Sequence, residues 1–211
     1  VTRLLTAGFS VKKHLPVAAR LGVPSLLVVL AQAGADITGA LSEAARAGHA
    51  GVIQELVGEL GAAAQERDDH GATPLHMAAL EGHVAAIKAL LDAGADASEV
   101  DADGLSPLHY AATTHGRVRL QRQQAVMKAL VQAAGPGLWT QSSARSSGLE
   151  PLHLAAASGD VGLARWLVLE EGVSDARTID AAGVTPADAA ERANHTVLAQ
   201  LLRGWAERSE L

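Results

Sequence analysis

The sequence predicts an all-α fold in which helix–turn–helix units stack into a solenoid and are joined by short β-hairpin loops. The main observation is a stretch at 70–79, HGATPLHMAA, which returns as DGLSPLHYAA at 103–112 and as SGLEPLHLAA at 147–156. A catalytic motif usually occurs once, whereas recurrence at intervals indicates a repeated structural unit. Hydrophobic residues make up 48% of the chain and aromatic residues only 2%. Such a core of Ala, Leu and Val favours closely packed short helices over a sandwich or a barrel.

The leucine of each Pro-Leu-His sequence sets the register of the repeat. The equivalent positions are Leu15, Leu41, Leu75, Leu108, Leu152 and Ala187. The intervals between them are 26, 34, 33, 44 and 35 residues, and a period near 34 is typical of stacked helical units. We expect one domain over 1–211 with six units and a partial one before them. The expected units are 1–11 (partial), 12–37, 38–67, 68–100, 101–146 (with an insertion), 147–179 and 180–211 (C-terminal cap).

Each unit carries the signals of two helices. In the 68–100 unit, Thr73 stands where a helix N-cap belongs, Pro74 follows at the first helical position, and Gly82 ends this Ala-rich helix. The segment VAAIKALLDAG follows with apolar residues at helical spacing, and the polar stretch ADASEVDADG predicts a hairpin. Equivalent capping and proline positions are Ser106, Thr185, Pro107, Pro151 and Pro186. The predicted core leucines are Leu75, Leu90, Leu108, Leu130, Leu152 and Leu167.

The irregular intervals predict local departures from this pattern. The interval of 26 implies that the first hairpin is missing or reduced to a turn around Thr38 and Gly39. In the 101–146 unit, seven extra residues lie between the helices, so we expect a second helix that is extended backwards, at the end opposite the hairpins. The last unit has Asp188 in place of the histidine and a charged tail, which suits a terminal cap.

These features together resemble the ankyrin repeat: Thr-Pro-Leu-His, then Ala-Ala, Gly-His, a Leu-Leu pair and Gly-Ala-Asp, at a period near 33. The third unit, 69–98, matches nearly throughout, and the opening RLLTAGFSV is similar to the end of a unit. We therefore expect the chain to begin within a repeat and to be a fragment of a larger protein. The resemblance implies that His76, His109 and His153 are structural groups that bond backbone near the base of the hairpins.

The sequence offers no support for catalysis or for a cofactor. There is no cysteine, which excludes disulfides, thiolate nucleophiles and Cys-based zinc sites and fits an intracellular, cytoplasmic protein. No G-x-S-x-G, HExxH, phosphate-binding glycine loop or EF-hand spacing is present. We predict that the protein is not an enzyme and binds no cofactor or metal. No segment is long enough to insert into a membrane.

The remaining histidines also favour a structural interpretation over a metal site. His49 and His83 follow a glycine at the turn between helices, and we expect both to be structural. Residues His14, His70, His115 and His195 are expected to be exposed and without a role.

The function that the resemblance implies is protein–protein interaction through the concave face of the stack, formed by hairpins and first helices. We expect the partner to be another protein, of unknown identity. A nucleic acid is not expected, because the net charge of the chain is −6. Tyr110, the only tyrosine, is a candidate contact residue, but packing against its neighbours explains it equally well. The candidate partner-binding residues are Asp69, His70, Met77, Leu80, Glu81, Asp101, Asp103, Leu105, Tyr110, Thr113, Thr114, Leu154 and Ser158.

A secondary patch is formed by Arg117, Arg119, Arg122 and Trp139. For its arginines, a solvated helix face is the first interpretation, an acidic protein partner the second and nucleic acid the last. Two alternatives for the whole chain stay open: a regulatory or targeting domain of a larger enzyme or channel, and a fixed structural subunit of a large assembly.

Overall fold

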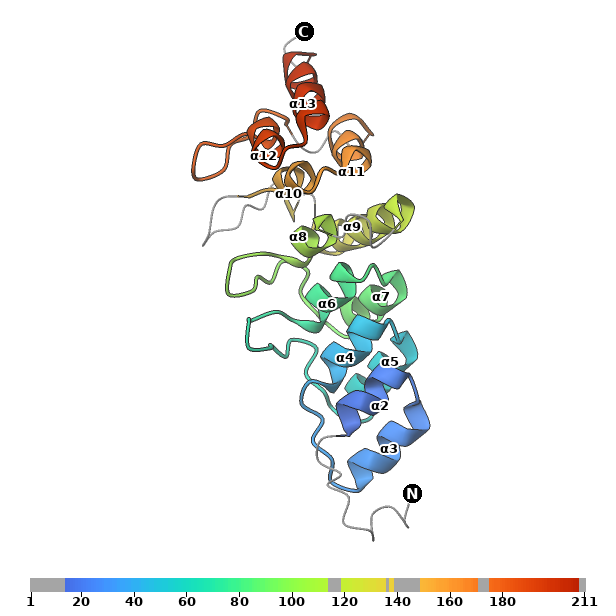
Figure 1. Cartoon of the computed structure of the whole chain (residues 1–211). Coiled ribbons are helices and arrows are strands. Elements are labelled where there is room, and N and C mark those ends of the chain that lie inside the picture. Colours follow the sequence, from blue (N-terminus) through green and yellow to red (C-terminus); the bar gives the residue numbers. More distant parts are fainter. Residues whose placement is uncertain (1–13, 114–118, 136, 139–148, 171–174, 209–211) are drawn as a thin grey trace.

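The structure, a computed structural model, describes residues 14–113, 119–135, 137–138, 149–170 and 175–208. It confirms the solenoid: six helix pairs follow one another from the N-terminal to the C-terminal end of the described chain (Figure 1). The first helices of the pairs are α2 (Leu15–Leu21), α4 (Ala40–Ala47), α6 (Pro74–Leu80), α8 (Pro107–Ala112), α10 (Pro151–Ser158) and α12 (Pro186–Arg192). The second helices are α3 (Pro24–Gln32), α5 (Ala50–Gly58), α7 (Val84–Asp92), α9 (Leu120–Ala134), α11 (Val161–Arg165) and α13 (Thr196–Arg208).

The two sets of helices form two layers. Each first helix contacts the first helix of the next unit, from α2 and α4 through α10 and α12. The second helices α3, α5, α7, α9 and α11 make a parallel row of contacts beside them. The loops at 59–73, 93–106 and 175–185, which connect one unit to the next, project from the side of the first helices (Figure 1).

The predicted capping residues begin the first helices. Thr73 and Ser106 are extended N-cap residues, each followed by proline at the first helical position. In both, the side-chain oxygen accepts from the backbone N–H of a histidine three residues on, and the imidazole accepts from the N–H of the cap residue. Thr185 forms the same box with Asp188, so a carboxylate replaces the imidazole in the last unit.

The core lies between the two layers. All six predicted core leucines have no exposed surface. Alanines fill most remaining core positions, among them Ala78, Ala111 and Ala155. Because a methyl side chain lets helix backbones approach closely, the aromatic-poor composition is explained by the spacing of the stack.

The two irregular intervals, of 26 and 44 residues, have separate structural outcomes. Only residues 33–39 join α3 to α4, and Asp36 accepts from the N–H and hydroxyl of Thr38 there, so the first hairpin is absent as predicted. Helix α9 begins one turn earlier relative to its core residue Met127 than α7 does relative to Ile87, which confirms the backward extension. After α11 the chain continues as a π-helical turn, Trp166–Glu170.

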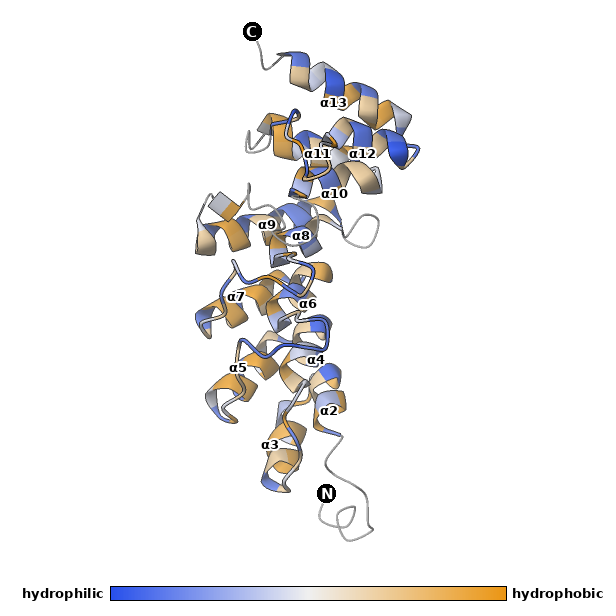
Figure 2. Ribbon diagram, turned by 90° about the vertical axis from the view of Figure 1, so that its left-hand side faces the viewer, coloured by the Kyte–Doolittle hydropathy of each residue, from blue (hydrophilic) through white to orange (hydrophobic). Residues whose placement is uncertain are grey.

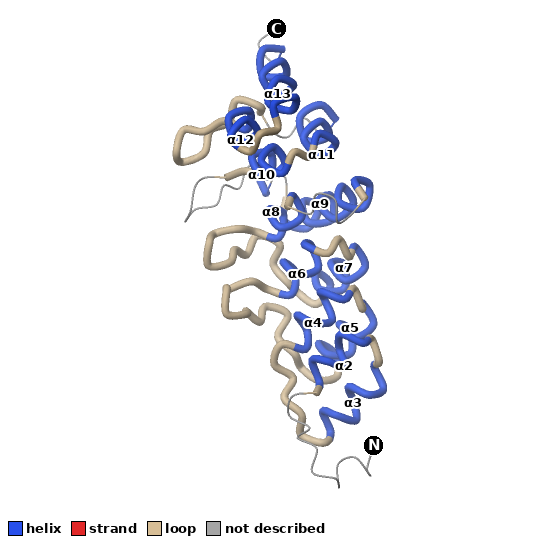
Figure 3. Tube along the Cα trace, in the orientation of Figure 1, coloured by secondary structure: helices blue, strands red, loops and turns tan. Residues whose placement is uncertain are grey.

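The loops differ from the predicted β-hairpins, because no strand forms in the part of the chain that the structure describes (Figure 3). Each tip holds isolated backbone pairs, such as Asp101 N–H to the Leu105 carbonyl at 3.0 Å, instead of a ladder. The loops are largely hydrophilic, whereas the helices carry apolar faces (Figure 2). Within the same described ranges, no helix combines the length and the apolar character needed to cross a bilayer. The expected partial unit at 1–11 lies outside the described residues.

Candidate protein-binding surface

The tips of the projecting loops share one construction around an aspartate. The Asp101 carboxylate accepts from the backbone N–H groups of Asp103 at 2.9 Å and Leu105 at 2.8 Å. Asp68 accepts in the same way from residues 70 and 72, and Asp180 from residues 182 and 184. A glycine three residues after each aspartate has a positive φ, for example 80° at Gly104. The sequence carries this signal as Asp-x-x-Gly, seven residues before the anchors Leu75, Leu108 and Ala187, and our sequence prediction missed its structural role.

Neighbouring tips are also bonded to one another. The N–H of Ala102 donates to the carbonyl of His70 at 2.9 Å. Arg67 donates to the carbonyls of Gly71 and Val100 and pairs with Glu99 of the next loop. The loops at 59–73 and 93–106 therefore form one braced surface.

This surface is strongly acidic. The loop residues 59–73, 93–106 and 175–185 contain ten acidic side chains and two arginines. Both arginines are already paired, Arg67 with Glu99 and Arg177 with Asp175. The excess negative charge is therefore available to a partner.

Three buried histidines fix the loops to the helices. Thr73 donates its N–H to Nδ1 of His76 at 3.1 Å, so the ring proton lies on Nε2, which donates to the Leu105 carbonyl at 3.0 Å. His109 bonds the Leu149 carbonyl at 2.8 Å and His153 the Val184 carbonyl at 3.1 Å. Burial lowers the pKa of all three, with the carbonyl bond opposing it, so they are neutral. The structural role implied for them is confirmed.

A second row of histidines was only partly expected. The rings of His49, His83 and His195 lie against glycines of the preceding unit, and His49 Nε2 is 3.0 Å from the Arg20 carbonyl oxygen. A Cβ at Gly48 would lie 2.6 Å from the His83 ring. The structural role of His49 and His83 is confirmed, whereas the expectation of an exposed, roleless His195 is wrong because its ring packs on Gly159.

Tyr110 and Asp101 belong to one buried network. The Tyr110 hydroxyl donates to Asp101 at 2.8 Å, and its ring meets the His76 ring edge-on with centroids 5.0 Å apart. Burial, together with the bond to Asp101, raises the pKa of Tyr110. Asp101 is only 6% exposed, so its expected place on the solvent-facing tip is corrected: it holds the tip together from inside.

The other predicted partner-binding residues differ in their exposure. Met77 is 6% exposed, with its sulfur 3.1 Å from an Arg46 nitrogen, which corrects its expected exposure. Asp69, His70, Asp103 and Thr113 are exposed. Thr114 lies outside the described residues. Half-buried positions on the same side are Leu80, Glu81, Leu105, Leu154 and Ser158.

The secondary patch lies on the opposite side of the stack. Arg119 is the N-cap residue of α9 and Arg122 lies in its first turn, both exposed. This end of α9 is away from the projecting loops (Figure 1). Arg117 and Trp139 lie outside the described residues.

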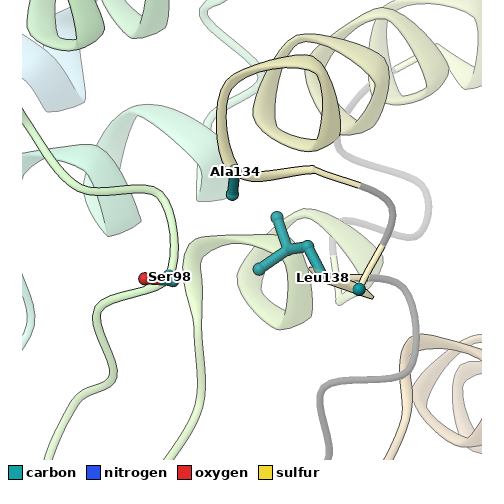
Figure 4. A pocket seen from close by; sticks show the side chains of 4 residues that line it. Ser98, Ala134 and Leu138 are labelled. Carbon is teal, nitrogen blue, oxygen red and sulfur yellow. The ribbon is translucent and has the colours of Figure 1, made fainter.

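Small cavities lie between neighbouring units. One of about 240 Å³ lies at the C-terminal end of α9, where Ser98, Ala134, Gly137 and Leu138 surround it (Figure 4). Its lining has no titratable side chain. Nor do three or more His, Asp or Glu side chains gather as metal ligands anywhere in the described ranges.

The comparisons with known proteins agree with this architecture. A family model for ankyrin repeats in three copies matches residues 15–101 and 41–136, and one for a single ankyrin repeat matches 147–180. No curated protein matches the chain. Two of these matches begin at the anchor leucines Leu15 and Leu41, so they follow the register of the helix pairs. Because they cover more than half of the sequence, the chain belongs to the ankyrin-repeat family.

Proposed function

We propose that this chain is a recognition module that binds a protein partner on the side of its projecting loops and catalyses no reaction itself. Ankyrin repeats are generally protein–protein interaction modules. The observation that carries the proposal is the braced row of loop tips, in which aspartate carboxylates fix each tip and the Ala102–His70 bond joins two of them. A surface ordered before binding loses little conformational entropy on association, which favours affinity.

The charge of this surface indicates the chemistry of the partner. Asp69 and Asp103 are exposed at adjacent tips, beside Asp68 and Asp101, whose carboxylates accept the backbone bonds that hold those tips in shape. With ten acidic side chains against two paired arginines on the loops, the surface suits a partner with a basic contact region. The lack of cysteine suits a partner inside the cell.

The test compares three full-length baits in quantitative affinity capture. Asp69→Asn with Asp103→Asn removes two tip charges and preserves the tip bonds, while Glu207→Gln removes an exposed charge on α13, far from the loops. The proposal expects a partner captured by the wild type and by Glu207→Gln to be lost or weakened with the tip variant. Each exposed charge pair contributes roughly 0.2–1 kcal/mol. Equal recovery with all three baits would exclude this surface.

A further inference from the structure

The fourth unit is a basic band in an acidic chain. No Asp or Glu occurs between Asp103 and Glu150, although the chain as a whole has a net charge of −6. The basic residues in this interval are Arg117, Arg119, Arg122, Lys128 and Arg145. Arg119 and Arg122 are the two that the structure places at an exposed helix end, on the rear side of the stack, opposite the loops.

The positive charges of Arg119 and Arg122 are not offset by an acidic residue in their own helical turn. A helix N-terminus carries a partial positive charge, so cations are unfavourable there and anions favourable. The first turn of α9 contains no acidic residue, and neither arginine forms an ion pair with a side chain that the structure describes. The arrangement is therefore one that an external anion would relieve.

A groove begins beside Arg122. It has a volume of about 260 Å³ and is lined by Gly48, Gly82, His83, Val84, Ala85 and Arg122. Two glycines line it, and the His83 ring, which also lines it, lies 2.6 Å from where a Cβ of Gly48 would be. At the groove, the N-terminus of α7 has no acidic cap, since the side chain of its N-cap residue His83 accepts no hydrogen bond there. By contrast, the N-terminus of α11 is capped by Asp160, which accepts from the N–H of Leu163 at 2.9 Å.

We propose that this rear groove, with Arg119 and Arg122, is a second docking surface that binds an acidic segment of a protein. One carboxylate of the segment lies in the groove against Arg122, and another lies against Arg119. The proposal rests on the proposed function in that the chain is a binding module, but it uses the opposite face and the opposite charge. A peptide is favoured over a nucleic acid because a long polyanion would meet the net negative charge of the remaining chain.

The probe is a fluorescein-labelled peptide of about ten alternating Glu and Gly residues, titrated with the full chain and followed by anisotropy. We expect saturable binding at about 50 mM salt that weakens as ionic strength rises. Arg119→Gln with Arg122→Gln should weaken it by about fivefold or more. The matched control is Arg20→Gln, an exposed arginine on α2 in the first unit, which does not line the groove and should bind as the wild type does.

Two further measurements distinguish failure of this proposal from failure of the proposed function and from loss of folding. The Asp69→Asn, Asp103→Asn variant should bind the acidic peptide normally, so the two surfaces are tested independently. Urea unfolding of the α9 variant should show no loss of stability, because removing cations from a helix N-terminus is favourable. The proposal would be overturned if the wild type did not bind the peptide, or if the α9 variant bound it equally well. It would also be overturned if Arg20→Gln caused an equal loss, or if a single-stranded DNA of equal charge bound more tightly.

Discussion

His76 of one unit donates its Nε2–H to the backbone carbonyl of Leu105 in the loop of the next unit, over 3.0 Å. The same ring accepts the N–H of Thr73 at Nδ1. One neutral side chain therefore caps its own helix and holds the following loop.

Replacing this ring should destabilise the stack. His76→Ala leaves the Leu105 carbonyl and the Thr73 N–H without these partners in a buried site, and each such group costs about 1–3 kcal/mol. Urea unfolding should show a loss within the sum of those costs. His70→Ala is the control, since that side chain is exposed and the bond at His70 uses its backbone carbonyl. A loss no larger than that of the control would contradict the bridging role.

Stability should also fall in mild acid. Burial lowers the pKa of His76, His109 and His153 below the ordinary value of 6.5, so the unfolded chain takes up protons before the folded chain does. Their contribution is complete above about pH 6.5 and is lost as the pH falls from there through the folded-state pKa values. Urea unfolding midpoints across this range should shift downward, and the shift should be smaller in His76→Gln. A pH-independent midpoint would contradict the neutral assignment.

Glu150 is an imperfect substitute for the Thr or Ser that begins α6, α8 and α12. Its Oε2 is buried with no hydrogen-bond partner, and burial raises its pKa. Glu150→Thr should stabilise the chain by about 1 kcal/mol, because it removes the unpaired carboxylate oxygen while a threonine hydroxyl can take over the bond from the N–H of His153. A raised folded-state pKa favours the folded state at low pH and loses that advantage as the pH rises through it, so the gain should be larger at neutral pH than in acid. Thermal unfolding at both pH values measures it.

Gly48 should tolerate no side chain, in contrast to Gly94. Both have positive φ, 78° and 86°, but a Cβ at Gly48 meets the His83 ring at 2.6 Å whereas nothing lies within 4 Å at Gly94. Gly94→Ala should therefore cost only the backbone strain, about 1 kcal/mol, and Gly48→Ala clearly more. Equal losses in urea unfolding would show that the ring moves aside freely.

The repeated parts of this fold could be predicted because their chemistry is local. Thr73 and Ser106 cap helices, and Leu75 and Leu108 are buried, wherever the motif occurs. The absence of strands could not be predicted, since a tip such as 101–105 satisfies its backbone through its own aspartate and needs no ladder.

Exposure at the candidate site was harder to predict. The periodicity of the repeat places Asp101 and Met77 on the side of the loops, yet tertiary neighbours cover both. The contact of His195 with Gly159 follows from the repeat register, since His195 lies eight residues after Ala187, as His83 does after Leu75. It was missed because Asn194, with a φ of 69°, replaces the glycine that precedes His83. The π-helical turn after α11 has no signal in the spacing of the repeat, since the interval of 35 residues is close to the regular period.

The imidazole bridges also bear on how the chain acquires its structure. Each joins only consecutive units, at separations of 29, 40 and 31 residues, so no contact of this kind has to wait for distant ends to meet. Assembly can then start at one unit and spread in both directions as each newly formed pair offers a template to the next. The unit around His76, whose sequence follows the repeat most fully, is the natural starting point for that growth.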